Sequence, residues 1–186
     1  MKFLLLISAL YIVQFSLTAQ TPLLSGKTTI YLVRHAEKEK GDDPELTEIG
    51  KQRAGDLMRT LKSKKLQRIY VTQYRRTQMT SDSTRIQLGV DTVHYVADTT
   101  GNDLLEKIKA HNDVGKSILV IGHSNTIPVV IKKLGVHNQA ISAIPDNEFD
   151  NLFVVKITKG KAVLKVKKYG AQSPKIAATQ TMQPLQ

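Results

Sequence analysis

Short apolar runs alternate with amphipathic segments along most of this 186-residue chain. Runs rich in β-branched residues predict strands, and apolar positions spaced near 3.6 residues predict helices. The predicted strands are 28–33, 68–72, 91–96, 117–122, 151–158 and 161–168. The predicted helices are 47–62, 76–88, 102–110 and 126–134. Strands that alternate with helices indicate an α/β protein, here a three-layer α/β/α sandwich with a mostly parallel central sheet and helices on both faces.

Two of these strands have patterns that predict their place in the sheet. The run 117–122 (SILVIG) is apolar without interruption, which is typical of a strand buried on both faces. In the last strand, Ala162, Leu164 and Val166 are expected to face inward and the alternating lysines outward, a pattern that discourages edge-to-edge pairing. The polar residues 170–186 after it are predicted to form a loose C-terminal tail.

The N-terminal residues resemble a targeting segment. Lys2 precedes an eleven-residue apolar run (3–13), and Ala19 ends the polar stretch that follows. Because the run is too short to span a bilayer, we interpret residues 1–19 as a cleaved signal peptide, followed by one domain over 20–169. This interpretation predicts a periplasmic or secreted protein with no stable membrane span after cleavage. A retained N-terminal membrane anchor is the alternative.

Composition narrows the possible classes of partner and site. The chain has no cysteine, which excludes a disulfide framework, a cysteine-ligated metal and a cysteine nucleophile. The formal net charge of +11 raises the question of nucleic acid. Aromatic residues make up only 5% of the chain and none interleaves with the C-terminal lysines, so a base-stacking platform is not expected. We therefore expect no nucleic-acid partner and interpret the charge as solvated surface that also attracts small anionic substrates. The sequence carries no signal for an oligomeric state.

Arginine and histidine residues follow the ends of three predicted strands. Arg34 and His35 follow the first strand, Arg76 lies just beyond the second, and His123 follows the buried strand. Ligands of α/β sheets bind beyond the carboxyl ends of the strands, so these four side chains are expected at one rim. Arginine forks match phosphate oxygens, and phosphoryl transfer depends mainly on positioning and fixed positive charge. Flanking guanidinium groups disfavour an imidazolium ion, so His35 is expected to be neutral near neutral pH.

Four sequence blocks resemble the signatures of the histidine phosphatase (phosphoglycerate mutase-like) superfamily, in particular its small phosphatases. They are 32–37 (LVRHAE), 43–54 (DPELTEIGKQRA), 71–80 (VTQYRRTQMT) and 120–125 (VIGHSN), in the family's order. The resemblance covers roughly residues 28 to 168. It implies a metal-independent phosphatase without a cofactor, which hydrolyses phosphomonoesters or phosphoanhydrides of a small phosphorylated substrate.

The resemblance also implies roles for individual residues. His35 would be the nucleophile that forms a phosphohistidine, and His123 would donate a hydrogen bond to the phosphoryl oxygens. Arg34 and Arg76 would bind the phosphoryl group. The backbone N–H groups of Ser124 and Asn125, at the start of a helix, would assist.

A general acid is implied some two dozen residues after the second arginine. Asp98, 22 residues past Arg76, is our prediction, and Asp103 is its competitor. Glu37 is expected to support the site without touching substrate. Family members that lack the acid cleave bonds with better leaving groups, phosphohistidine among them.

Several alternatives remain at this point. One is a phosphohistidine or phosphoprotein phosphatase, another is a phosphatase of envelope polysaccharides, and a third is a non-catalytic module that binds a phosphorylated ligand. A metal site on His35 and His123 is disfavoured, because no third ligand is evident and the arginines would repel a cation. His94, His111 and His137 are expected to be surface or capping residues.

Overall fold

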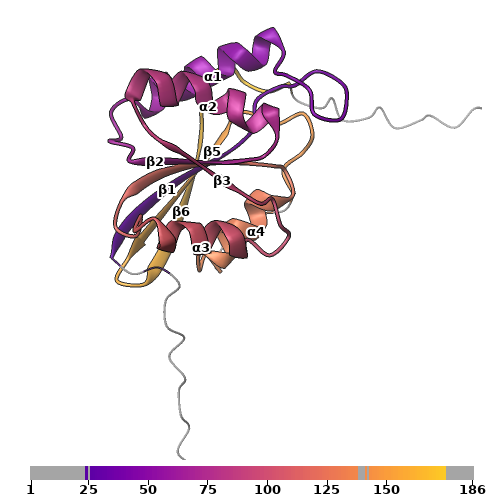
Figure 1. Ribbon diagram of the computed structural model, residues 1–186. Helices are drawn as coiled ribbons and strands as arrows, with labels where there is room; N and C mark the ends of the chain where they lie inside the picture. The colour runs from indigo at the N-terminus through magenta and orange to yellow at the C-terminus, as the bar shows by residue number, and fades with distance from the viewer. Residues whose placement is uncertain (1–23, 25, 138–140, 142, 175–186) are drawn as a thin grey trace, which may run out of the picture.

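A computed structural model describes residue 24, residues 26–137, residue 141 and residues 143–174 (Figure 1). The predicted signal peptide, 1–19, and residues 175–186 of the predicted tail lie outside this part of the chain. Within it, no helix combines the length and apolar character that a membrane crossing requires.

The described residues form ten elements in the order that the sequence predicts. The strands are β1 (Lys27–Arg34), β2 (Arg68–Thr72), β3 (Thr92–Tyr95), β4 (Ser117–Gly122), β5 (Asn151–Thr158) and β6 (Lys161–Lys168). The helices are α1 (Glu48–Leu61), α2 (Arg75–Leu88), α3 (Asn102–Ala110) and α4 (Thr126–Lys133). Every boundary agrees with the prediction to within one residue.

The strands form one six-stranded sheet in the order β3-β2-β4-β1-β5-β6. β1, β2, β3 and β4 run parallel, while β5 is antiparallel to both of its neighbours. Helices α1 and α2 cover one face of the sheet, and α3 and α4 cover the other (Figure 1). The predicted three-layer α/β/α sandwich is therefore confirmed.

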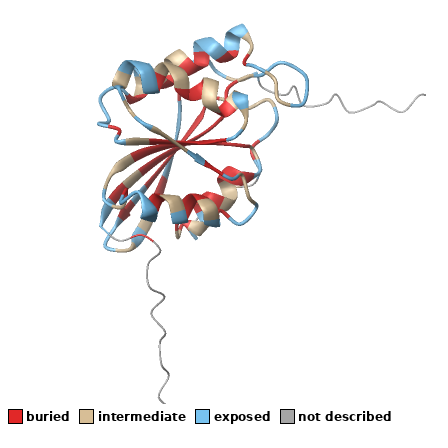
Figure 2. Ribbon diagram, in the orientation of Figure 1, coloured by how far each residue is buried: buried red, intermediate tan, exposed pale blue. Residues whose placement is uncertain are grey.

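Apolar side chains on the two faces of the sheet form two main core clusters. One combines Leu57 and Leu61 of α1 with Val33 and Ile121, and the other combines α3 and α4 residues with the opposite face. In β4, Ile118 through Gly122 are all buried, which confirms the strand predicted to be covered on both faces. Figure 2 shows the same buried centre, with the sheet coloured red between its helices.

The edge strand β6 and the residues after it differ from the sequence-based expectation. Leu164 is buried as predicted, but Val166 is 48% exposed, because the outermost strand of a sheet is only partly covered. The described beginning of the tail, 170–174, is not loose. Ser173 and its neighbours make hydrogen bonds with residues that precede β5.

Candidate active site

The register of β1 and β4 brings the two histidines together. Arg34 and Gly122 are paired positions in these neighbouring parallel strands, so the residues that follow them leave the sheet side by side. The backbone N–H of His35 donates to Gly122 O at 3.0 Å. The rings of His35 and His123 lie with their centroids 5.5 Å apart in an edge-to-face arrangement.

Gly122 has a steric reason to precede His123. A Cβ atom at this position would lie 3.0 Å from Tyr95 Oη and 3.2 Å from Ile127 Cγ1. A larger residue would therefore require the Tyr95 and Ile127 side chains to shift by a few tenths of an ångström. Gly50 in α1 has a similar role, since a Cβ there would lie 2.1 Å from Glu37 O in the loop after β1.

Arg76 reaches the histidine pair from the first turn of α2. Its Nη2 lies 3.5 Å from His123 Nδ1, and its guanidinium carbon lies 4.2 Å from the centre of the Tyr74 ring. A pocket of about 490 Å³ opens at this place. Its lining includes five residues that the sequence predicted: His35, Arg76, His123, Ser124 and Asn125.

Arg34 is not among the residues that line this pocket, and its guanidinium is bound by the loop before β5. Its Nη1 donates to Pro145 O at 2.9 Å, to Asp146 O at 3.0 Å and more weakly to Glu148 O at 3.4 Å. Its guanidinium carbon lies 4.2 Å from the centre of the Phe149 ring. The Nε donors of Arg34 and Arg76 are buried and have no partner among the described residues. Buried donors are normally satisfied in native proteins, so these two Nε–H groups are candidate donors to a bound anion.

The hydrogen bond made by His35 defines its tautomer. Nδ1 lies 2.8 Å from Ala36 O. A carbonyl oxygen can only accept, so Nδ1 carries the proton and the neutral ring has its lone pair on Nε2. An imidazole with this lone pair is the form that can attack phosphorus.

His35 is neutral mainly because it is buried. Burial is the largest cause that lowers its pKa to about 3. The hydrogen bond to Ala36 opposes this shift, and Arg34, His123 and Arg76 add to it by charge repulsion. The sequence predicts a neutral His35 because of its flanking arginines, whereas burial is the larger cause of the lowered pKa.

His123 is fixed by a chain of threonine hydroxyl groups. Its Nε2 lies 3.1 Å from Thr72 Oγ1, which lies 3.0 Å from Thr77 Oγ1. Since Arg76 can only donate to Nδ1, the neutral ring donates from Nε2 to Thr72. Burial, followed by repulsion from Arg76 and Arg34, lowers the pKa of His123 to about 4.

A third buried threonine in the same sequence block supports the His35 loop. Thr80 Oγ1 accepts a hydrogen bond from Ala36 N at 2.9 Å and donates to Arg76 O at 2.6 Å. The block 71–80 therefore contributes buried threonine hydroxyl groups to the site as well as Arg76. It connects both histidines to the first turn of α2.

Glu37 makes contacts that agree with a supporting role. Its carboxylate accepts from Arg53 Nε at 2.8 and 2.9 Å and from Nη2 at 2.7 Å. Its backbone oxygen accepts from Thr47 N at 3.0 Å, and Thr47 in turn caps α1 by accepting from Gly50 N. Thr47 is therefore the N-cap of α1 and links this helix to the loop after β1.

The position of Asp98 does not support its predicted role as general acid. Its carboxylate accepts from Thr100 N at 2.6 Å and Asp103 N at 3.2 Å, and also from Gly101 N, ahead of α3. Burial alone would raise the pKa of Asp98, but these bonds and the Thr100 hydroxyl outweigh burial and lower the pKa to about 2. A carboxylate in this state has no proton to give at neutral pH. Ala97 lines the pocket, and Asp98 does not.

Asp103 does not take its place. Its Oδ2 accepts from Val96 N at 2.6 Å, which ties α3 to the end of β3. Among the described residues, those that line the pocket include no Asp or Glu. Both candidate acids are therefore used to build the turn between β3 and α3.

Several residues around the site carried no prediction. Lys38 and Tyr74 line the pocket, and the Tyr74 ring lies 5.4 Å from the His123 ring. The place of Tyr74 two residues before Arg76 was a usable signal, because aromatic faces often pack on arginine. Phe149, whose ring centre is 6.2 Å from that of His35, follows a stretch without a helical or strand pattern.

The other histidines lie apart from the pocket. His94, His111 and His137 are exposed, and His111 is the C-cap of α3, as expected for surface or capping residues. Within the described ranges, no three or more His, Asp or Glu side chains are grouped so that they could hold a metal ion.

The fold and the pocket define an α/β/α protein with imidazole and guanidinium groups at the carboxyl ends of parallel strands. The model of the histidine phosphatase superfamily (branch 1) matches residues 30–98. This match confirms the resemblance seen in the sequence over this segment of the chain. His123 and the loop that holds Arg34 lie outside the matched segment.

Solved structures share the fold at low sequence identity. The protein histidine phosphatase SixA complexed with tungstate has a TM-score of 0.59 and 17% identity, over 75% of this chain and 96% of that chain. A putative phosphohistidine phosphatase SixA from Nakamurella multipartitia has a TM-score of 0.58 and 19% identity, over 80% and 98%. A putative alpha-ribazole-5'-P phosphatase from Escherichia coli K-12 has a TM-score of 0.60 and 12% identity, over 81% and 99%. A search of curated proteins finds no match to this chain.

Proposed function

We propose that this protein is a phosphatase that hydrolyses phosphomonoesters or phosphoanhydrides through a phosphohistidine on His35. The observation that carries the proposal is the state of His35: a neutral ring with its Nε2 lone pair available, in one pocket with His123 and Arg76. The superfamily match over 30–98 and the phosphatase names of the similar structures support the same class of reaction.

The reaction proceeds in two displacements on phosphorus. In the first, His35 Nε2 attacks phosphorus, an N–P bond forms, and the bond to the leaving oxygen breaks. In the second, water attacks phosphorus, the N–P bond breaks, and inorganic phosphate leaves with the water oxygen. Arg34 and Arg76 stabilise the charge on the phosphoryl oxygens in both steps.

His123 has a proton-dependent part in this scheme. A bound phosphate dianion would counter the repulsion from Arg76 and Arg34 and so raise the pKa of His123. Proton uptake at Nδ1 would then let His123 donate to a phosphoryl oxygen, while Nε2 stays bonded to Thr72. This protonated ring is also the one group in the proposal that could supply a proton to the leaving oxygen.

A phosphate-release screen over many phosphorylated metabolites in EDTA tests the proposal. We expect turnover that EDTA does not reduce, and none with His35→Ala. During turnover of a ³²P-labelled substrate, acid-labile and base-stable label should appear on His35. Label on another residue, or full activity of the variant, would refute the mechanism. Binding of phosphorylated compounds without phosphate release would instead favour a non-catalytic binding module.

Phosphohistidine is a second candidate substrate, favoured by the residues of the pocket. In the part of the chain that the structure describes, no carboxyl group that could act as general acid lines the pocket. An imidazole leaving group has a pKa near 6.5 and accepts a proton far more easily than an alkoxide does. Comparison of a phosphohistidine peptide with an alkyl phosphate tests this candidate. It predicts a higher kcat/KM for the peptide, and equal or lower values would exclude it.

The localisation of the protein in the cell is a separate proposal, which rests on the sequence of residues 1–19. We propose export to the periplasm or the medium with cleavage near Ala19. N-terminal sequencing of the protein from its native cell fractions tests this. An intact N-terminus in the membrane fraction would show the retained anchor instead.

A further inference from the structure

The loop that holds Arg34 is itself held by the residues that follow the last strand. This C-terminal clamp is defined here as residues 169–174. Ser173 Oγ accepts from Phe149 N at 2.8 Å, and Ser173 N donates to Asp150 Oδ2 at 3.2 Å. Tyr169 N donates to Asp150 O at 3.0 Å. Phe149 and Asp150 are thus fixed on one side by the clamp, while the Phe149 ring lies under the Arg34 guanidinium on the other.

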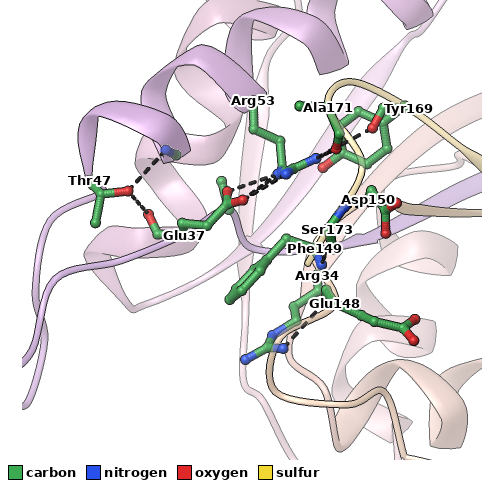
Figure 3. A network of polar contacts seen from close by, with 12 residues as sticks. Arg34, Glu37, Thr47, Arg53, Glu148, Phe149, Asp150, Tyr169, Ala171 and Ser173 are labelled. Atoms are coloured by element: carbon green, nitrogen blue, oxygen red, sulfur yellow. Dashed lines mark hydrogen bonds and ion pairs between the residues drawn. The ribbon is translucent and has the colours of Figure 1, made fainter. Parts of the chain in front are cut away.

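The clamp is anchored through a buried arginine. Arg53 Nη1 donates to Ala171 O at 2.9 Å, while its Nε and Nη2 bind the Glu37 carboxylate. Figure 3 shows Arg53 between Glu37 on one side and Ala171 and Tyr169 on the other. Only 3% of Arg53 is exposed, so solvent screens these bonds little.

These contacts form a continuous series that connects Arg34 to Glu37. The path runs from Arg34 to the carbonyl groups of 145–148, through Phe149 to Ser173, and then along the clamp to Arg53 and Glu37. Glu37 lies two residues after His35. The same network therefore orients one phosphate-binding arginine relative to the nucleophile.

We propose that Ser173 is a positioning residue that acts through Arg34 on phosphate binding. This inference rests on the proposed function, because it assigns Arg34 to the phosphoryl group. Without the Ser173 hydroxyl, Phe149 N loses its acceptor and the loop 145–149 gains freedom. The Arg34 guanidinium then samples more orientations, and a smaller fraction of them can donate to a phosphate oxygen.

Ser173→Ala tests the proposal with inorganic phosphate as the probe. We expect the Kd of phosphate and the KM of p-nitrophenyl phosphate to rise about fivefold, the equivalent of one hydrogen bond. The kcat should change less, because Arg34 holds the phosphoryl group in ground and transition states alike. Ser173→Thr keeps the hydroxyl and should restore both constants.

A matched control separates positioning from general loss of stability. Thr28 Oγ1 accepts from Gly115 N at 2.7 Å, so Thr28→Val removes the same kind of bond at the other end of the sheet. It should lower the thermal midpoint by a similar amount without changing the Kd of phosphate. An equal rise of Kd in both variants would show that Ser173 acts only through stability, and would overturn the proposal.

Combining Ser173→Ala with arginine variants identifies the residue through which it acts. In an Arg76→Lys background, Ser173→Ala should still lower kcat/KM about fivefold. In an Arg34→Lys background it should have almost no further effect. A full effect in both backgrounds, or none in the unmodified protein, overturns the inference but leaves the proposed function intact. Failure of the unmodified protein to bind phosphate overturns both.

Discussion

The ends of β1, β2 and β4 and the loop before β5 support the same site in different ways. The strand ends carry the reactive groups in short motifs, such as Arg34-His35 and Gly122-His123. The loop at 143–150 carries backbone carbonyls and one aromatic ring, which hold Arg34. The proposed catalysis depends on which side chains stand at the strand ends. The binding of Arg34 by the loop depends mainly on where the backbone carbonyl groups lie.

This difference predicts how each region responds to substitution. Changes to the reactive groups at the strand ends should remove most of the catalysis without unfolding the protein, because these groups are few and cannot be replaced. Changes in the loop or the clamp should weaken ligand binding by small steps, because several bonds share the task. The following predictions test this contrast, from the largest expected effect to the smallest.

Replacement of the nucleophile should have the largest effect. In His35→Asn the side-chain amide can still donate to Ala36 O, but no lone pair remains at the place of Nε2. We expect kcat to fall by at least about 10³-fold. Steady-state kinetics measures the loss, and inorganic phosphate binding provides the control. If phosphate binds normally while turnover persists at more than a tenth of its original rate, His35 is not the nucleophile.

Lysine at either arginine should give the next largest effect. One ammonium group cannot reproduce a planar fork, so Arg76→Lys should lower kcat/KM by about 10²-fold. Arg34→Lys should do the same and also destabilise the fold by about 1 kcal/mol, because the bonds to Pro145 O and Asp146 O are lost. Urea unfolding of both variants measures the contrast. Equal stabilities would show that the loop does not depend on Arg34.

The sequence predicted the reactive groups better than it predicted their support. The periodicity of apolar residues predicted the helices and strands. The expectation that ligands bind beyond the carboxyl ends of strands correctly predicted that His35, Arg76 and His123 share one pocket. No local pattern marks Phe149 or Ser173, because their role arises from contacts between segments distant in the sequence. Sequence spacing placed Asp98 at 22 residues past Arg76 but could not show that its carboxylate accepts backbone N–H bonds ahead of α3 and does not line the pocket.

Acid should destabilise the protein through its buried histidines. The pKa values of His35 and His123 are lowered to about 3 and about 4 in the folded state, whereas an unfolded histidine titrates near 6.5. Below pH 6.5 the unfolded chain binds protons that the native site does not, so stability falls as pH falls. Each histidine contributes about 1.4 kcal/mol per pH unit to this slope.

Urea unfolding between pH 6 and 4.5 isolates the histidines, because most carboxyl groups titrate below this window. His35→Asn should reduce the slope by about 1.4 kcal/mol per pH unit. The exposed His94→Asn serves as the control and should keep the slope of the unmodified protein. Identical slopes in all three proteins would mean that His35 is protonated in the native state.

Asp98 should show the smallest effect on catalysis. Its carboxylate accepts backbone N–H bonds ahead of α3 and does not line the pocket, so its loss affects the turn and not the reaction. Asp98→Ala should lower the free energy of unfolding by about 1 kcal/mol, because the backbone N–H groups of the turn lose their acceptor. The kcat for an alkyl phosphate should change by less than about threefold, whereas loss of a general acid typically costs about 10² to 10⁴. A hundredfold fall in kcat for the alkyl phosphate, with kcat for phosphohistidine unchanged, would restore Asp98 as the acid. It would also require the turn before α3 to rearrange when substrate binds.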